Sequence, residues 1–115
     1  MGRFSNAFAN KPLEIDLIES ELAAIKKEVL SACNPARIVV FGSAARGEAR
    51  TGSDLDIAVF AASKAELPEL RRKVLAAVSA KALPLDWVFA DLESLQTPRA
   101  SRGILEQILL DGRDL

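Results

Sequence analysis

The 115-residue sequence contains no histidine and no tyrosine, and both absences limit the chemistry that the chain can perform. Without histidine, a bound metal ion must be held by carboxylates, hydroxyls, carbonyls or water, and these ligands favour a hard ion such as Mg²⁺ over zinc. Histidine is also the commonest general base in enzymes, so its absence excludes that route of proton transfer. Without tyrosine, the chain has no phenolic hydroxyl of its own that could accept a transferred group.

Cysteine is almost absent as well. Cys33 is the only one, so no disulfide can form within the chain, and we expect a reducing compartment. Because Cys33 sits in an apolar helical pattern, we expect it to be buried packing. Residues 1–10 lack the apolar region of a signal peptide, and no apolar run approaches the roughly 20 residues that span a bilayer. We therefore expect a cytoplasmic protein without a membrane segment.

The charges are nearly balanced, with a formal net charge of −1. A protein whose main substrate is nucleic acid usually has a basic excess, because contacts with phosphate supply most of its affinity. Nucleic acid is therefore not expected as the direct substrate. The length fits one domain, and we expect a flexible arm over residues 1–12 followed by a single domain over residues 13–115.

Hydrophobic periodicity predicts an α/β (α+β) fold, in which helices pack on one small β-sheet. The first helix has an apolar face made of Ile18, Leu22, Ile25 and Val29. The predicted elements are, in chain order, a helix over Leu13–Cys33, a strand over Arg37–Phe41, a helical turn from Gly42 to about Arg46, a polar loop over Gly47–Gly52, a strand over Asp54–Phe60, a helix over about Pro68–Lys81, a strand over Leu83–Ala90 and a helix over about Pro98–Asp111.

The helix over Pro68–Lys81 has two competing start signals. Ser63 and Glu66 resemble a capping box, whereas Pro68 favours the first helical position, and both cannot mark the same start. Pro84 suits the beginning of a strand or the edge of a sheet. The residues expected to face inward are Leu70, Val74, Leu75 and Val78 in this helix, and Ile104, Leu105, Ile108 and Leu109 in the last one, which Gly112 closes.

Three acidic residues lie on two of the predicted strands. Asp54 and Asp56 are two positions apart on one strand, so their side chains point to the same side and can reach into one volume. Without cations the two carboxylates would repel each other, and a half-buried face is a costly place for that repulsion. Asp86 is expected in the middle of the third strand. If it joins the other two, three carboxylates can hold a pair of Mg²⁺ ions.

The Gly42-Ser43 pair directly follows a strand and opens a helical turn. Glycine lets the backbone approach a phosphate closely, and backbone N–H groups at a helix start, together with the Ser43 hydroxyl, favour an anion. Arg46 lies one turn further on, and its guanidinium group can donate charge-assisted hydrogen bonds to a triphosphate oxygen. Each of these features is ordinary when taken alone, as a turn, a solvated strand face or a surface charge. Their joint spacing indicates a functional site.

The stretch Phe41–Phe60, FGSAARGEARTGSDLDIAVF, resembles the signature of the nucleotidyltransferase superfamily that includes DNA polymerase β and kanamycin nucleotidyltransferase. More narrowly, it is similar to the minimal nucleotidyltransferases of prokaryotes, and the similarity extends over about Arg37 to Asp111. The resemblance implies a nucleotidyltransferase fold with a mixed sheet. It also implies that Asp54 and Asp56 bind both metal ions and that Asp86 is the third carboxylate. Ala44 departs from the pattern, since many relatives have a basic residue there, and NTP affinity is expected to be lower.

The resemblance further implies an enzyme of the EC 2.7.7 class that uses two Mg²⁺ ions, which Mn²⁺ can replace, to move AMP from ATP to a hydroxyl. Minimal nucleotidyltransferases are commonly antitoxins of type VII toxin–antitoxin systems. There they adenylylate a tyrosine of a HEPN-type toxin, and a hetero-oligomer with this partner is then expected. Two alternatives stay open. One is an adenylyltransferase for a small molecule of the aminoglycoside kind, and the other is a non-catalytic antitoxin that occludes its partner.

Overall fold

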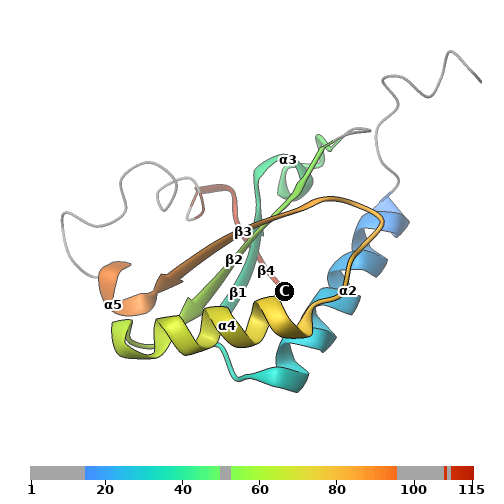
Figure 1. The fold of residues 1–115 in the computed structure, drawn as a ribbon. Coiled ribbons are helices and arrows are strands. Elements are labelled where there is room, and N and C mark those ends of the chain that lie inside the picture. Colours follow the sequence, from blue (N-terminus) through green and yellow to red (C-terminus); the bar gives the residue numbers. More distant parts are fainter. Residues whose placement is uncertain (1–14, 50–52, 96–107, 109) are drawn as a thin grey trace, which may run out of the picture.

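A four-stranded mixed sheet forms the centre of the protein (Figure 1). The computed structural model describes residues 15–49, 53–95, 108 and 110–115. Strand β1 pairs antiparallel with both β2 and β4, and β2 runs parallel to β3, so the strand order is β3-β2-β1-β4. The strands are β1, Arg37–Phe41; β2, Leu55–Ala61; β3, Leu85–Asp91; and β4, Arg113–Asp114.

The helices confirm the predicted α/β class. They are α2, Ile15–Ala32; α3, Gly42–Ala45; the 3₁₀ turn η1, Lys64–Glu66; α4, Leu67–Ala77; and α5, Leu92–Leu95. Helix α4 is the crossover that a parallel pair of strands requires, since it connects β2 to β3. Among the described residues, none of the helices combines the length and the apolar character needed to cross a bilayer.

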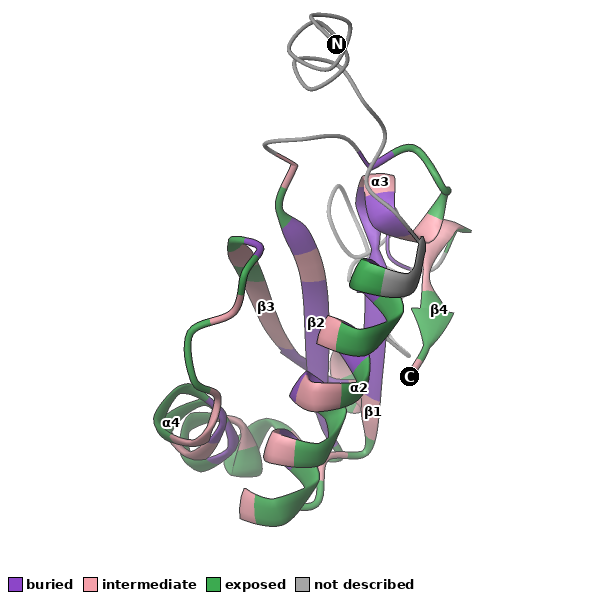
Figure 2. Ribbon diagram, turned by 90° about the vertical axis from the view of Figure 1, so that its right-hand side faces the viewer, coloured by how far each residue is buried: buried purple, intermediate pink, exposed green. Residues whose placement is uncertain are grey.

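Helices α2 and α4 lie together on one face of the sheet, as the two ribbon views show (Figures 1 and 2). The predicted apolar face of α2 is buried there, against Leu55, Ile57 and Val59 of β2. Cys33 was expected to be buried and is only half-buried at the edge of this core, where its Sγ donates a hydrogen bond to the Val29 carbonyl at 3.4 Å.

A second, smaller apolar cluster forms on the opposite face of the sheet. It contains Val39 and Phe41 of β1, Ala58 and Phe60 of β2, Ala90 of β3, and Ile108. From Ala58 onward, therefore, β2 is buried on both faces, which is typical of a central strand with cover on either side. Before Ala58, the second face carries Asp56 instead.

The strands fall close to their predicted ranges. Strand β1 has the predicted bounds, and β2 begins and ends one residue later than predicted. Strand β3 begins at Leu85, so Asp86 is its second residue, and its prediction in the middle of the strand was wrong. Pro84 precedes β3, which lies at an edge of the sheet, as its missing N–H suggested.

The two start signals near α4 mark two consecutive elements. Ser63 precedes η1, and its Oγ donates a hydrogen bond to Glu66 Oε2 at 3.0 Å. Pro68 lies in the first turn of α4, which begins directly after η1. The conflict in the sequence disappears because the 3₁₀ turn supplies one start and the α-helix the next.

Helix α4 ends at Ala77, before the predicted Lys81, because Val78 is already extended with ψ 119°. Leu70 and Val74 are buried as predicted, but Leu75 is 45% exposed, so its inward prediction was wrong. The reason is geometric. Residues four apart share one face of a helix, whereas Leu75 is rotated about 100° from Val74.

The chain ends in a strand that the sequence pattern does not predict. Arg113 and Asp114 pair with Val40 and Val39 of β1, and the Leu115 N–H donates to the Ile38 carbonyl at 3.0 Å. The Gly112 N–H donates to the Ile108 carbonyl at 2.8 Å and closes the preceding helix, as predicted, and Ile108 is buried. The rest of that predicted helix, with Ile104, Leu105 and Leu109, and the predicted arm over residues 1–12 lie outside the described residues.

Candidate active site

Asp56 and Asp86 lie side by side at the start of the parallel pair of strands. They are direct partners in the register of β2 and β3, and the Asp86 side chain lies close enough to raise the pKa of Asp56. Asp54 precedes β2 and is exposed, and its charge also acts on Asp56. The structure thus brings Asp56 and Asp86 of the three predicted acids into one pair, with Asp54 at the exposed margin beside them.

The environment of Asp56 disfavours its charged form. Burial raises the pKa of Asp56 most, followed by the charge of Asp86, the hydrogen bond with Asp86 and the charge of Asp54. The positive charge of Arg46 acts in the opposite direction and lowers the pKa of Asp56. Two acidic groups in contact on a partly buried face are unfavourable unless a proton or a cation lies between them.

Gly42 closes the site from the side of β1. It has a φ of +72°, a left-handed conformation that glycine adopts without strain. A Cβ atom at this position would lie 2.2 Å from Asp56 Oδ2, closer than any non-bonded contact allows. Glycine is therefore required here both by the backbone angle and by the approach of the Asp56 carboxylate to the main chain.

Helix α3 begins at Gly42, beyond the end of β1, and spans a single turn (Figure 1). Ser43 is half-buried in this turn, and its carbonyl accepts a hydrogen bond from the Glu48 N–H at 2.8 Å. Gly47 has a φ of +74° where the chain leaves the turn, and an added Cβ atom would meet nothing within 4 Å. The Gly-Ser turn therefore stands directly beside the acidic side chains.

Arg46 is engaged by two carboxylates that the sequence analysis did not connect with it. Its Nε donates to Glu48 Oε1 at 3.0 Å, and its Nη1 donates to Asp111 Oδ2 at 2.9 Å. These hydrogen bonds raise the pKa of the Arg46 guanidinium. Asp111 is distant in sequence, so no local pattern could have revealed this contact.

The acidic side chains suit a hard divalent cation. Carboxylate oxygens are ligands that Mg²⁺ and Mn²⁺ prefer, and a cation would offset the repulsion between Asp56 and Asp86. In the part of the chain that the structure describes, no three acidic or cysteine side chains are already grouped as metal ligands. Asp56 and Asp86 form a preorganised pair, while Asp54 stands at the exposed margin of the site.

A groove of about 680 Å³ lies at the other end of the sheet. Its walls come from Cys33 and the residues that lead into β1, from Ala61 at the end of β2, and from Leu70 and Lys73 of α4. The acids lie at the opposite end of β2, so the groove and the acidic cluster are separate features. The acidic cluster is the candidate active site, because the charges and the Gly-Ser turn converge there.

The profile of the nucleotidyltransferase domain family matches residues 22–110. The chain belongs to this family. The matched range includes every strand and helix that positions the acids and the Gly-Ser turn. Nucleotidyl transfer, which uses an NTP and a divalent metal ion in this family, is therefore the general activity of the fold that holds the site.

Two solved structures are similar to this chain. One is a protein from Sulfolobus solfataricus, provisionally classified as a nucleotidyltransferase, with a TM-score of 0.54 and 20% identity over 90% of this chain and 88% of that one. The other is a toxin–antitoxin structure with AMP-PNP, with a TM-score of 0.46 and 26% identity over 80% of this chain and 69% of that one. The first likeness shows the fold alone. A comparison with curated proteins gave no match.

Proposed function

We propose that this protein is a metal-dependent nucleotidyltransferase that moves AMP from ATP to a hydroxyl group, with Asp54, Asp56 and Asp86 as ligands of two Mg²⁺ ions. The observation that carries the proposal is the contact of Asp56 with Asp86 across β2 and β3, beside Gly42. In a nucleotidyltransferase domain, two carboxylates at this place can bind metal ions, and the bound ions offset the repulsion between the two negative charges. Mn²⁺ is expected to replace Mg²⁺ because it prefers the same ligands.

When bound, the ions supply Lewis-acid activation of the attacking hydroxyl and charge stabilisation of the departing pyrophosphate. In the transfer, the acceptor oxygen forms a bond to the α-phosphorus of ATP, and the bond from that phosphorus to the pyrophosphate oxygen breaks. The proton of the acceptor hydroxyl passes to the carboxylate of Asp86, which is exposed at the edge of the sheet and open to an incoming group.

The Gly-Ser turn holds the triphosphate in this proposal. The backbone at Gly42 and Ser43 and the Ser43 hydroxyl provide hydrogen-bond donors beside the acids. Arg46 provides a guanidinium, which exchanges Glu48 or Asp111 for a phosphate oxygen when the nucleotide binds. Ala44 adds no charge, so Arg46 has the larger share in holding the phosphates.

The acceptor hydroxyl is proposed to belong to a tyrosine of a HEPN-type toxin, with this protein as the antitoxin of a type VII pair. Two observations support an acceptor on another protein. The chain contains no tyrosine, and Asp54 and Asp86 are exposed, so a hydroxyl on a large partner can reach them. The pairing with a HEPN toxin itself comes from the resemblance to minimal nucleotidyltransferases.

The test is to express the protein together with the product of the neighbouring gene, as the proposed HEPN-type partner, and to measure the intact mass of that product. The expected result is a mass increase by one or more AMP groups, located on a tyrosine by peptide sequencing. Asp54→Asn and Asp56→Asn should both abolish the increase, and a chelator should abolish it with purified components. Asp114→Asn is the matched control, because Asp114 is exposed on β4 at the other edge of the sheet.

The alternatives give different results in the same experiment. If the two Asn variants still neutralise the partner without any mass change, the protein is an occluding antitoxin, and the transfer proposal is wrong. If the partner stays unmodified while an added aminoglycoside is adenylylated, the acceptor is a small molecule. Transfer that persists in the presence of chelator would contradict the assignment of the acids as metal ligands.

A further inference from the structure

The loop between α4 and β3 is held by two glutamates of α2. Residues 78–84 form neither helix nor strand, so their backbone N–H groups need partners from elsewhere. Glu21 Oε1 accepts hydrogen bonds from the N–H groups of Ala82, at 2.6 Å, and Leu83, at 3.3 Å. Glu28 Oε1 accepts from the Ser79 hydroxyl at 2.6 Å and from the Ser79 N–H at 3.4 Å.

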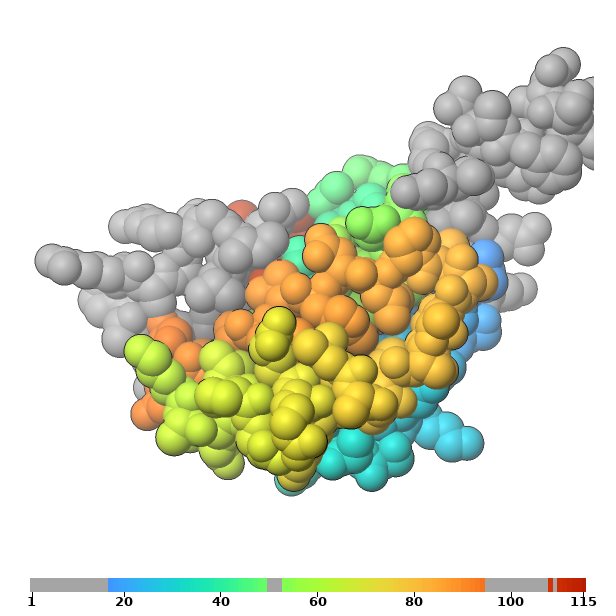
Figure 3. Space-filling model, viewed as in Figure 1, coloured from blue at the N-terminus to red at the C-terminus, as the bar shows by residue number. Residues whose placement is uncertain are grey.

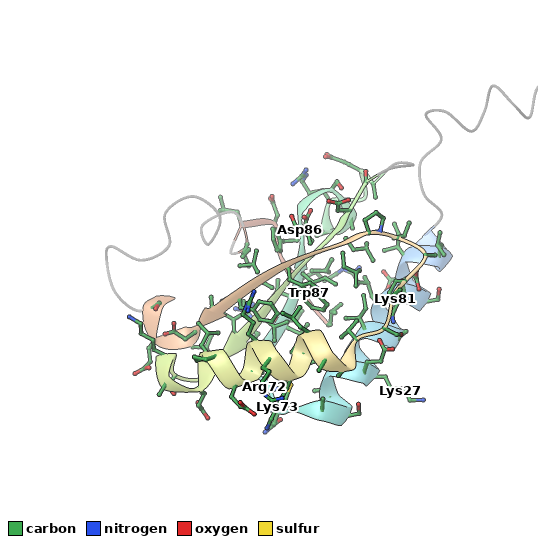
Figure 4. All side chains as sticks on the ribbon, in the orientation of Figure 1. Lys27, Arg72, Lys73, Lys81, Asp86 and Trp87 are labelled. Carbon is green, nitrogen blue, oxygen red and sulfur yellow. The ribbon has the colours of Figure 1, made fainter. Side chains whose placement is uncertain are left out.

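Lys81 completes this set of contacts. Its side chain is only 6% exposed, and its Nζ donates to Glu28 Oε2 at 2.6 Å and to the carbonyl and hydroxyl oxygens of Ser79, each at 3.0 Å. Figure 4 shows Lys81 beside α2. An ammonium group that is removed from water needs a charged partner in good geometry, so these contacts specify one conformation of the loop.

The spacing of the glutamates suits the length of the loop. Glu21 and Glu28 are seven residues apart, about two helical turns, and so lie along one side of α2. In the space-filling view, the loop passes along α2 before it enters β3 above α4 (Figure 3). We name the contacts of Glu21 and Glu28 with residues 79–83 the loop clamp.

The loop clamp ends three residues before Asp86. Leu83, which Glu21 holds by its N–H, is buried in the main core, and the Pro84 carbonyl accepts a hydrogen bond from the Leu55 N–H at 2.8 Å. Strand β3 is an edge strand, so its backbone is paired with β2 only. A slip of one residue in this pairing would turn Asp86 to the opposite face of the sheet, away from Asp56.

We propose that Glu21 and Glu28 are positioning residues for Asp86: the loop clamp sets the place where β3 begins and thereby keeps Asp86 opposite Asp56. The role of Asp86 as a metal ligand rests on the function proposed above, but the effect on the position of β3 does not. Removing a group that hydrogen-bonds a metal ligand commonly changes metal affinity by about 10- to 100-fold, and the loop clamp, which acts on Asp86 only through the start of β3, should have an effect at the lower end of this range.

The chain offers a conservative variant and a matched control. Glu21→Ala removes the acceptor of two backbone N–H groups, whereas Glu21→Gln retains an oxygen that can accept them. Glu19→Ala removes a carboxylate from the same helix that bonds Arg113 of β4, at the other edge of the sheet. Ser79→Ala is a milder variant, for use if Glu21→Ala does not fold by circular dichroism, because it removes only one hydroxyl from the clamp.

Three measurements on the full chain test the proposal. They are hydrogen exchange of β3, Mn²⁺ binding followed by electron paramagnetic resonance with a non-hydrolysable ATP analogue present, and the separate kcat and KM for ATP. For Glu21→Ala we expect faster exchange at the start of β3, Mn²⁺ affinity weakened by about 10-fold or more, and a lower kcat with KM little changed. Glu21→Gln should restore all three, and Glu19→Ala should change none of them.

Different results would contradict the positioning role of the glutamates and the proposed function. If Glu21→Ala leaves the exchange of β3 and the binding of Mn²⁺ at wild-type values, the positioning role is wrong. It is equally wrong if Glu19→Ala causes the same losses, because the effect is then one of general stability. If the wild-type protein binds no Mn²⁺ and transfers no nucleotide, the proposed function fails, while hydrogen exchange still decides whether the clamp sets β3.

Discussion

One face of β2 presents Leu55, Ile57 and Val59 to the helices, and each of these side chains is at most 1% exposed. The other face begins with Asp56 and continues with Ala58 and Phe60. On the first face, alternation produces a continuous apolar core. On the second, the same alternation places a carboxylate in contact with Asp86 before the apolar residues resume. The comparison shows that the period of a strand sets which residues share a face, while the neighbouring elements decide what that face does.

The two faces are also closed in different ways. Side chains of α2 and α4 cover the helix face, whereas the main chain at Gly42 approaches Asp56 on the other face. A side-chain cover excludes water and contributes to stability, because apolar surface is buried. Where the main chain packs against the carboxylates instead, its polar N–H and C=O groups lie beside them. Substitutions on the two faces should therefore affect stability and transfer differently.

The largest effect on stability is expected at Ile57, which is fully buried on the helix face. Ile57→Ala should lower the free energy of unfolding by about 2–5 kcal/mol, because it leaves a cavity in the core. Asp56→Asn, one position away, should leave stability at neutral pH unchanged or increased, since it removes repulsion with Asp86. Urea unfolding of both variants makes the comparison. A loss at Asp56→Asn as large as at Ile57→Ala would mean that this carboxylate is structural.

The two glycines with positive φ separate backbone strain from the collision with Asp56. An alanine in the left-handed region costs roughly 1–2 kcal/mol, so Gly42→Ala and Gly47→Ala should share that loss of stability. Only Gly42→Ala also drives a Cβ atom into Asp56 Oδ2. Thermal unfolding together with transfer activity should show activity lost at Gly42→Ala and largely kept at Gly47→Ala. Equal activity in the two variants would show that Asp56 can move aside without consequence.

Ser43→Ala should weaken nucleotide use without changing the fold. A hydrogen bond to a charged group contributes about 1.5–3 kcal/mol, which corresponds to an increase of roughly 10- to 100-fold in KM for ATP. The Ser43 carbonyl that accepts the Glu48 N–H is retained, so the turn should persist. Steady-state kinetics and circular dichroism measure the two effects. If the helical signal collapses, the hydroxyl of Ser43 has a structural role.

The smallest effect is expected in the dependence of stability on pH. The pKa of Asp56 is raised in the folded protein above its ordinary value of 3.8, so the folded state binds this proton more tightly than the unfolded state. Its contribution to stability is complete below pH 3.8 and is lost as the pH rises through the raised pKa. The stability of the wild type minus that of Asp56→Asn should therefore fall with rising pH across this window, without added metal. A rise would mean that the Asp56 carboxylate is stabilised in the fold.

Carboxylates elsewhere in the molecule should act with the opposite sign. Hydrogen bonds lower the pKa of Glu28, chiefly from Lys81, and of Asp114, chiefly from Arg37. Their contributions are present above the ordinary pKa of each group and are lost as the pH falls through the lowered one. The difference in stability between Asp56→Asn and the wild type at each pH isolates the contribution of Asp56, because the other carboxylates contribute equally to both proteins.

The elements that the sequence predicted well are those with a strong local signal. The apolar residues of α2 recur every three or four positions, and β1 is a run of β-branched and aromatic residues that ends at Phe41, directly before Gly42. The Gly-Ser turn and the spacing of Asp54 and Asp56 could be recognised for the same reason, because they are short patterns within about 20 residues. Asp86 could be named as a candidate, but its place opposite Asp56 depends on the pairing of two strands.

The elements that the sequence did not predict have signals that are weak or distant. Strand β4 consists of Arg113 and Asp114 alone, and two charged residues carry no periodicity. Leu75 fits an apolar helical pattern, yet only the packing of α4 against α2 determines which residues of that helix are buried. The contact of Arg46 with Asp111, and the loop clamp, join segments more than 50 residues apart.

The sequence by itself determined the types of element, the apolar faces and the set of acidic, glycine and serine residues available for chemistry, because periodicity and turn chemistry act over a few residues. Only the tertiary structure decided that Asp86 faces Asp56, that Gly42 lies against that carboxylate, and that two glutamates of α2 hold the approach to β3. These relations depend on strand register and on contacts across the fold. No local pattern contains them, because the partners meet only when the sheet and its helices have assembled.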